Sequence, residues 1–252
     1  MTSSRETRVA PEPATTDGDA GWRAGALSLL ALVRLLQLAS PTLPIGAYSY
    51  SQGLERVIED GAVRDSASAQ AWIGDLLELV VARAEAPIAW RLLNAAEERD
   101  WRALSSWNAW FRASRETAEL RAETEQMGGS LAKLASGLEV FDASTLDALK
   151  TLAPITLPAA FALTALGFKI PAQAALTAYV WSWLENQVLA AVKLVPLGQV
   201  AGQRLLVALG AMIPAVVATA MATGDDDLST FAPGFALASA RHETQYTRLF
   251  RS

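Results

Sequence analysis

The feature that most constrains the fold is a long stretch of the chain that carries very few charges. Between Thr151 and Thr223 the charged side chains are Lys169, Glu185, Lys193 and Arg204. Apolar residues within this stretch recur at helical spacing, and prolines and glycines divide it into segments. Helices that are apolar on every side are typical of the centre of a large helical domain. The stretch therefore predicts a nearly neutral central bundle.

The same stretch raises the question of a membrane span, because Leu205–Thr223 holds 19 residues without a charge. That length is sufficient to cross a bilayer. However, the segment is rich in Ala, Gly and Thr, Pro214 lies in its middle, and no basic cluster flanks it to set an orientation. We therefore expect a cytoplasmic protein without a membrane span. An intramembrane protein is the alternative, which a detergent-free soluble preparation would exclude.

Helical signals also dominate the rest of the chain, and sustained period-2 alternation is nearly absent from the sequence. We expect an all-α fold, a single-domain bundle of roughly ten helices with an apolar central core, over residues 26–252. Residues 1–25, rich in Pro, Thr, Ser and charged residues, are expected to form a disordered leader. The expected elements are helices at Leu27–Leu38 and near Ser51–Glu59, one capped by Asp65 or Ser66, one beginning near Pro87, two amphipathic helices that meet near Ser114, a turn at Phe141–Ser144 with a cap at Ser144, apolar helices at about Pro154–Gly167, Pro171–Ala191 and Gly198–Ala222, and a last helix at Ala232–Arg241.

The scarcity of metal-ligating side chains narrows the possible chemistry. The chain contains no cysteine and a single histidine, His242, and its formal net charge is −5. Disulfides, thiolate metal sites and the usual zinc ligand sets are excluded in a single chain, and nickel also prefers imidazole and thiolate ligands. The acidic balance does not favour nucleic-acid binding. We expect no cofactor and no enzymatic activity, and a hydrolase that uses carboxylates or His242 is the competing class.

A loop rich in hydroxyl and amide side chains is the first of four segments that depart from plain core patterning. It spans Leu36–Glu55, where two prolines and a glycine predict a rigid turn. The loop presents Tyr48, Tyr50 and Gln52 in close succession. These side chains either face a partner or belong to a turn whose serine caps the next helix.

Two further segments place polar residues on predicted helices. In Ser114–Arg121 the pattern predicts a solvated face with i,i+4 ion pairs, such as Glu119 with Arg115. Buried polar groups are costly unless they are paired, so those of the third segment either bond to one another and to helix ends or face a partner. That segment is Trp181–Gln199, and its polar residues include Glu185, Asn186, Gln187 and Lys193.

Lys193 admits two interpretations, since it lies near the end of an apolar helix, just before Val195 and Pro196. It either binds the last carbonyl groups and complements the helix dipole, or points outward and contacts a partner protein. Glu185 is the candidate ion-pair partner of Lys193, or a second contact.

The fourth segment is the tail, Ala240–Ser252, which mixes arginine and aromatic residues. That composition is favoured at interface hot spots, although a frayed terminus is the alternative. Because burial of the apolar side chains of Leu249 and Phe250 is favourable, we expect the tail to dock. We also expect removal of Glu243–Ser252 to leave the fold intact. The candidate binding residues of the tail are Arg241, His242, Glu243, Gln245, Tyr246, Arg248, Phe250 and Arg251.

Together the four segments resemble the UreF family of urease accessory proteins. The loop is similar to the family's signature near its start. The patterns Arg-Glu-Thr-Ala-Glu-Leu-Arg, Trp-Leu-Glu-Asn-Gln through Lys-Leu-Val-Pro-Leu-Gly-Gln, and Arg-His-Glu-Thr-Gln-Tyr with Arg-Leu-Phe-Arg-Ser follow in the family's order. The resemblance spans roughly residues 27–252, and it departs from the family at Val200–Gly202, where more polar residues are expected.

The resemblance implies an all-helical homodimer that carries no metal or cofactor of its own. It further implies binding to the accessory protein UreD (also called UreH), through that complex to the GTPase UreG, and docking on apo-urease during nickel insertion. The tail is the candidate UreD-docking element. Tyr48–Gln52 is a second candidate for this surface or the cradle of the tail, and Glu185 and Lys193 are candidate contacts for the GTPase.

Overall fold

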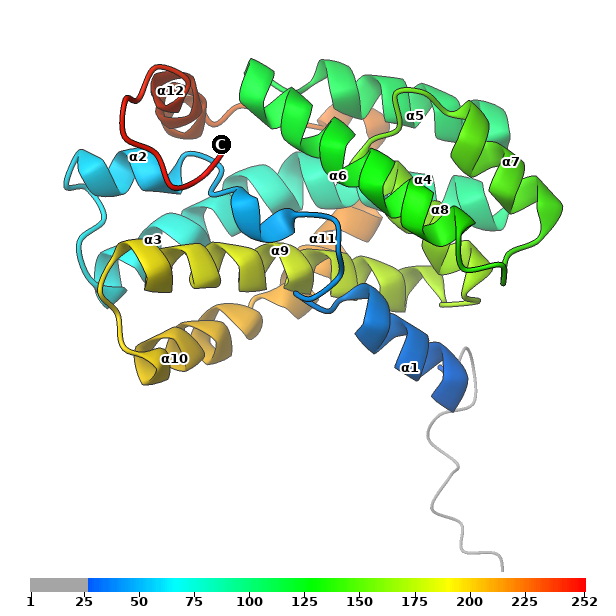
Figure 1. The fold of residues 1–252 in the computed structure, drawn as a ribbon, viewed down its shortest axis with the longest axis horizontal. Helices are drawn as coiled ribbons and strands as arrows, with labels where there is room; N and C mark the ends of the chain where they lie inside the picture. The colour runs from blue at the N-terminus through cyan, green and yellow to red at the C-terminus, as the bar shows by residue number, and fades with distance from the viewer. Residues whose placement is uncertain (1–26) are drawn as a thin grey trace, which may run out of the picture.

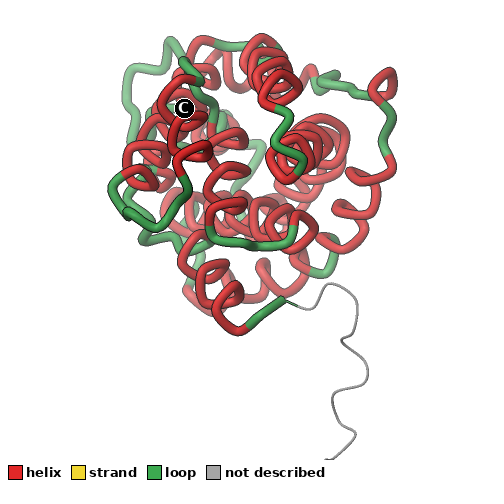
Figure 2. The backbone as a smooth tube through the Cα atoms, turned by 90° about the vertical axis from the view of Figure 1, so that its right-hand side faces the viewer, coloured by secondary structure: helices red, strands yellow, loops and turns green. Residues whose placement is uncertain are grey.

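The computed structural model describes residues 27–252, and the expected leader at residues 1–25 lies outside the described residues. Every regular element in the described part of the chain is helical, which confirms the all-α fold (Figures 1 and 2). One hydrophobic cluster gathers buried side chains from Leu38 through to Phe250. The core thus draws on nearly the whole length of the described chain.

The first third of the chain forms two short helices and one long rod. Ser28 caps the first helix through its side chain, which accepts the Ala31 N–H at 3.1 Å. Asp65, one of the two residues expected to cap this helix, caps the start of the rod and forms a capping box with Ser68. The elements are α1 (Leu29–Leu38), the 3₁₀ turn η2 (Ala47–Ser49), α2 (Leu54–Glu59), α3 (Ser66–Leu76), the π-helical segment η3 (Leu77–Glu85) and α4 (Ala86–Glu97).

The expected helix start near Pro87 is confirmed, because α4 begins at Ala86, but α3, η3 and α4 follow one another without a break. Proline has no N–H and clashes with the carbonyl four residues earlier in a regular α-helix. The wider π-helical turns before Pro87 accommodate this, and the Ala86 N–H bonds to the Val81 carbonyl. In a regular α-helix the Arg83 carbonyl would accept the N–H of residue 87, which proline lacks. It accepts the Ser229 N–H at 3.1 Å instead.

The middle of the chain contains three helices, α5 (Trp101–Ala113), α6 (Ala118–Ser136) and α7 (Ala143–Thr151). The expected break near Ser114 is confirmed, but another separates α4 from α5 because Asp100 caps the Ala103 N–H. The cap of α7 is Asp142 rather than the expected Ser144, since the Asp142 side chain accepts the Thr145 N–H at 3.0 Å.

The last third contains the most apolar helices. The expected helix at Gly198–Ala222 is two helices, because a turn at Ala211–Met212 precedes Pro214. Gln199–Ala222 is the one segment among the described residues that has the length and composition of a membrane span. The turn leaves two pieces that are each much shorter than the ~20 residues that a span needs. The elements are α8 (Leu157–Gly167), α9 (Ala172–Leu194), α10 (Gln199–Gly210), α11 (Ile213–Ala222), the 3₁₀ turn η4 (Asp225–Asp227) and α12 (Pro233–His242).

Helix α8 lies at the centre of the molecule, where residues 158–165 are all buried. It crosses α6 closely at Gly128, where a Cβ atom would lie 2.4 Å from the Ile155 carbonyl oxygen. Glycine is therefore required at the crossing. The long helix α9 packs beside α8 and runs across the whole bundle (Figure 1).

Some helices carry apolar side chains that nothing in the described chain covers. On α1 the exposed residues include Leu29, Leu30, Val33 and Leu36, and on α10 they include Val200 and Val207. Large exposed apolar surfaces are uncommon on monomers and mark interaction surfaces.

Candidate partner-docking surface

The tail lies against the loop that precedes α2, although the two are about two hundred residues apart in sequence. The Ser51 N–H donates to the Ser252 carbonyl oxygen at 2.6 Å, and the Arg251 N–H donates to the Ser49 carbonyl oxygen at 2.8 Å. Figure 1 shows the tail passing α2 and ending close to α6. The loop is therefore the cradle of the tail, which is one of the two roles expected for it.

Glycine fixes the shape of this loop at two positions. Gly46 and Gly53 have φ angles of +82° and +79°, which side-chain-bearing residues rarely adopt. Gly53 also lets α12 approach, because a Cβ atom there would lie 3.1 Å from the Ser239 nitrogen. The N-cap of α2 is Gly53, which makes no side-chain cap bond, rather than the expected serine. Ser51, two residues earlier, accepts the Glu55 N–H at 3.3 Å through its Oγ, which also donates to the Ser252 carbonyl oxygen at 2.6 Å.

Glu55 of α2 is a buried carboxylate that holds the tail. Its Oε1 accepts the Leu249 N–H at 2.7 Å, and its Oε2 accepts the Phe250 N–H at 3.0 Å. The same Oε2 lies 3.2 Å from His242 Nε2. The Phe250 ring is buried, and Lys193 Nζ lies 4.8 Å from its centroid in a cation–π contact. Backbone groups and the Phe250 ring thus contribute to the expected docking of the tail, whereas Leu249, which was also expected to be covered, is exposed.

His242 is fully buried at the end of α12, between two carboxylates. Its Nδ1 lies 2.7 Å from Glu119 Oε2, and the other oxygen of Glu119 accepts from Arg248. The expected ion pair between Glu119 and Arg115 does not form, because Arg115 pairs instead with Glu85 in the interior. The first turn of α6 is therefore part of the tail's contacts rather than a solvated face.

Glu243 caps α6 from outside that helix. Its Oε1 accepts the Ala118 N–H at 2.8 Å and the Glu119 N–H at 3.2 Å, which would otherwise lack intrahelical partners. Removing Glu243–Ser252 would take away this cap and would leave the Glu55 carboxylate buried without its backbone donors. The structure therefore argues against the expectation that such a truncation leaves the fold intact.

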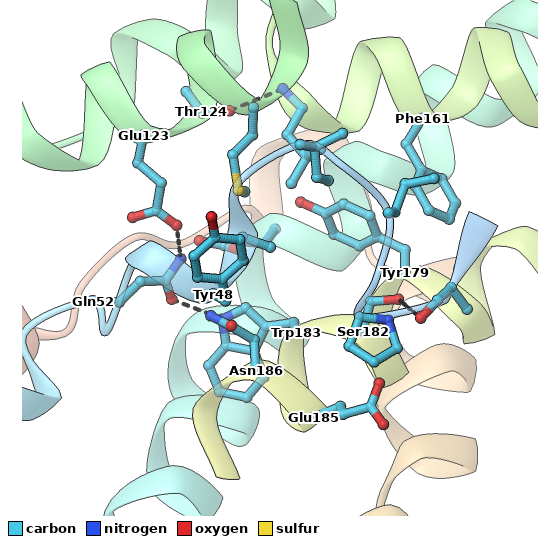
Figure 3. Close-up of a pocket in the computed structure, with 18 of the residues that line it drawn as sticks. Tyr48, Gln52, Glu123, Thr124, Phe161, Tyr179, Ser182, Trp183, Glu185 and Asn186 are labelled. Carbon is cyan, nitrogen blue, oxygen red and sulfur yellow. Dashed lines mark hydrogen bonds between the residues drawn. The ribbon is translucent and has the colours of Figure 1, made fainter. Parts of the chain in front are cut away.

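A pocket opens beside the loop, between α6 and α9 (Figure 3). On one side Gln52 bridges two elements: its Nε2 donates to Glu123 Oε1 at 2.8 Å, and its Oε1 accepts from Trp183 Nε1 at 2.8 Å. Apolar side chains form most of the remaining wall. They include Leu38, Leu43, Phe111, Met127, Phe161 and Leu189.

Glu123 connects this pocket to the tail. Its second carboxylate oxygen accepts from Ser252 Oγ at 2.7 Å, and the residue is almost entirely buried. Burial disfavours the charged form and raises the pKa of Glu123 to about 7, although the hydrogen bonds from Ser252 and Gln52 oppose this. Deeper in the same pocket lie the Arg115–Glu85 ion pair and Tyr179, whose phenol pKa is raised by burial.

The polar residues of α9 divide between the two expected roles. Asn186 Nδ2 donates to the Tyr50 carbonyl oxygen at 3.0 Å, which ties α9 to the loop. The buried side-chain amide of Gln187 has no hydrogen-bond partner among the described residues. Glu185 lines the pocket half-buried, and desolvation raises its pKa. It forms no ion pair with Lys193 in the described chain, and Lys193 is exposed.

The sequence-predicted binding residues differ in how far solvent reaches them. Gln52 and Glu185 are partly buried, and four others are buried: Tyr50, His242, Gln245 and Phe250. The exposed ones are Tyr48, Lys193, Arg241, Glu243, Tyr246, Arg248 and Arg251. The exposed residues can meet a partner directly, although Arg248 and Glu243 also bond to α6, and the buried ring of Phe250 helps to hold the tail in place.

Sequence reasoning did not find the carboxylates that hold the tail, Glu55 and Glu123. A signal for Glu123 was present, because apolar Leu120 and Met127 lie three residues before and four after it on the same helix face. Glu55 likewise lies three residues before Ile58 on a short helix. Neither pattern, however, indicates which distant group the carboxylate meets.

Comparisons with known proteins agree on one family. A family model described as UreF matches residues 63–210, more than half of the chain. The urease accessory protein UreF of Janthinobacterium sp. (strain Marseille) is 55% identical over 222 residues, which cover 88% of this chain and 98% of the relative. That of Azoarcus sp. (strain BH72) is 56% identical over 229 residues, covering 89% and 97%. The bifunctional urease accessory protein UreEF of Bordetella bronchiseptica is 56% identical over 224 residues, which cover 88% of this chain and 52% of that relative.

Proposed function

Because the chain belongs to the UreF family of urease accessory proteins, which are not enzymes, we propose that it acts as a scaffold in urease maturation. In this proposal the protein works in the cytoplasm as a homodimer and binds UreD (UreH). Through that complex it recruits or regulates the GTPase UreG while nickel is inserted into apo-urease.

The observation that carries the proposal is the meeting of the four segments on one side of the molecule. The loop holds the tail, the first turn of α6 binds it through Glu119, and α9 joins through Asn186 and Lys193. Around these buried contacts the exposed residues Tyr48 and Tyr246 offer large aromatic surfaces to solvent. Aromatic and arginine residues on a rigid support are typical of interface hot spots.

The ligand chemistry favours a scaffold over a nickel carrier. The sequence has no cysteine and one histidine, and both ring nitrogens of that histidine already face carboxylates. Among the described residues, no group of three or more His, Cys, Asp and Glu side chains is placed to hold a metal. Nickel would then be carried by a partner, and this chain would position that partner.

The homodimer is supported by the uncovered apolar residues of α10 and α11. Less than half of Gln199–Ala222 is buried in a single chain, although this segment is strongly apolar. A second copy of this chain presents the same nearly uncharged face, so two copies can cover the apolar residues of each other.

A pull-down with purified UreD and UreG, with and without guanine nucleotide, tests the scaffold role. We expect the chain to bind UreD without nucleotide, and UreG to join the complex only when UreD is present. Direct binding of UreG without UreD would contradict the proposed order, and absence of UreD binding would refute the function.

A further inference from the structure

His242 is the only histidine of the chain, and both of its ring nitrogens face carboxylate oxygens. Nδ1 lies 2.7 Å from Glu119 Oε2, and Nε2 lies 3.2 Å from Glu55 Oε2. A neutral imidazole has one N–H donor and one acceptor nitrogen, so one of these contacts would set two acceptors against each other. The doubly protonated ring makes both hydrogen bonds, which is why we assign the imidazolium to this geometry.

The other hydrogen bonds of the two carboxylates favour their ionised form. Glu55 already accepts the backbone N–H groups of Leu249 and Phe250, and Glu119 already accepts from the Arg248 guanidinium. These donors stabilise the charged form of both carboxylates, so we place the extra proton on the ring.

The charges around the ring favour this state. Facing His242 are Glu55 from α2, Glu119 from α6 and Arg248 from the tail, and Glu243 lies next in the chain on the N–H of Glu119. A positive ring balances these charges more closely than a neutral one. The ring also lies at the C-terminal end of α12, where the helix dipole favours a cation.

The two carboxylates that bind the ring are also the ones that bind the tail. We propose that His242 is a proton-dependent latch: the imidazolium holds Glu55 and Glu119 where they bind residues 248–250, and the neutral ring lets that segment loosen. This deepens the proposed function, because the tail is the proposed UreD-docking element. The latch itself is a property of the isolated chain.

The direction of the effect follows from the charges. Raising the pH removes the ring proton, which converts one charge-assisted hydrogen bond into an acceptor–acceptor contact. Such a loss corresponds to a change of about tenfold or more in an opening equilibrium. The tail is thus docked while the ring is charged and opens more often once it is neutral.

The single histidine gives the ring titration a signal that no other histidine overlaps. In the untagged protein, nitrogen chemical shifts of the His242 ring report its charge as pH is raised, while hydrogen exchange reports protection of the Leu249 and Phe250 amides. Protection is expressed relative to an unstructured peptide at the same pH. We expect it to fall by about tenfold or more at the same pH midpoint as the ring titration, with amides of α8 unaffected. A neutral ring beside a fully protected tail would overturn the latch.

The variant His242→Gln cannot carry the charge. Its Leu249 and Phe250 amides should be weakly protected at every pH, without the fall in protection expected for the wild type. Thr247→Ala changes an exposed tail position and should show the same pH-dependent fall in amide protection as the wild type. A His242→Gln variant with the same pH-dependent fall in amide protection as the wild type would also overturn the proposal. If circular dichroism shows that this variant does not fold, the wild-type titration alone decides. A normal titration in a chain that does not bind UreD would refute the proposed function and leave the latch intact.

Discussion

At the scale of single residues, buried carboxylates decide how the tail is held, and Glu123 is the one whose proton should be measurable. Its pKa in the folded protein is about 7, against an ordinary value of 4.5. Between these two pH values the folded chain keeps a proton that the unfolded chain has released. The free energy of unfolding should therefore fall as pH rises through this window, by at most about 3 kcal/mol.

The variant Glu123→Gln removes this titration while its amide can still accept from Gln52. We expect its stability to change less between pH 5 and 7 than that of the wild type, as measured by urea unfolding. The exposed variant Glu116→Gln is the control and should follow the wild type. Parallel pH profiles for Glu123→Gln and wild type would show that burial does not hold a proton there.

Local residue roles could be predicted from the sequence, whereas long-range pairs could not. Asp65 was one of the two caps expected for α3, and its side chain accepts the Ser68 N–H at 2.8 Å. Glu119 was expected to pair with Arg115 on its own helix face. Its actual partner His242 lies 123 residues away, so no local rule could select it.

At the scale of helices, the crossing of α6 and α8 depends on one of two adjacent glycines. A methyl group on Gly128 would meet the backbone of residues 155–157, whereas one on Gly129 would meet nothing within 4 Å. We expect Gly128→Ala to destabilise the protein by about 1–3 kcal/mol or more, because backbone cannot move aside easily. Gly129→Ala should stabilise it by about 0.5–1 kcal/mol, through helix propensity.

Thermal unfolding of the two variants under the same conditions measures this difference. Equal melting temperatures for Gly128→Ala and Gly129→Ala would contradict the close crossing. Glycine inside a helix otherwise weakens it, so the close approach at Gly128 is the physical reason for a glycine there.

Helix type was easier to predict than helix boundaries. Apolar periodicity identified α8 and α9, and proline marked their starts within a few residues. At Pro87 the expected start of α4 is equally close, but the continuity of α4 with the π-helical segment before it was missed. The turn between α10 and α11 was also missed, since the apolar residues continue across it without a change in composition.

At the scale of the whole molecule, the uncovered apolar face predicts self-association. We expect light scattering at micromolar concentration to give about twice the 26.8 kDa mass of one chain. Val207→Glu, which places a charge on the exposed face of α10, should shift the protein towards the monomer without loss of helical circular dichroism. A monomeric wild type would contradict the homodimer, and a dimeric Val207→Glu would place its interface elsewhere.

The affinity for UreD is the most direct test of the central claim, that the loop and the tail form a docking surface. Calorimetry should compare the wild type with Tyr48→Ala and Tyr246→Ala, which truncate exposed aromatic rings, and with Val140→Ala, an exposed position in the loop between α6 and α7. We expect each tyrosine variant to keep its fold and to bind UreD with a Kd raised by about tenfold or more, as for the loss of a hot-spot residue, while Val140→Ala binds as the wild type does. Unchanged affinity in both tyrosine variants would contradict the account.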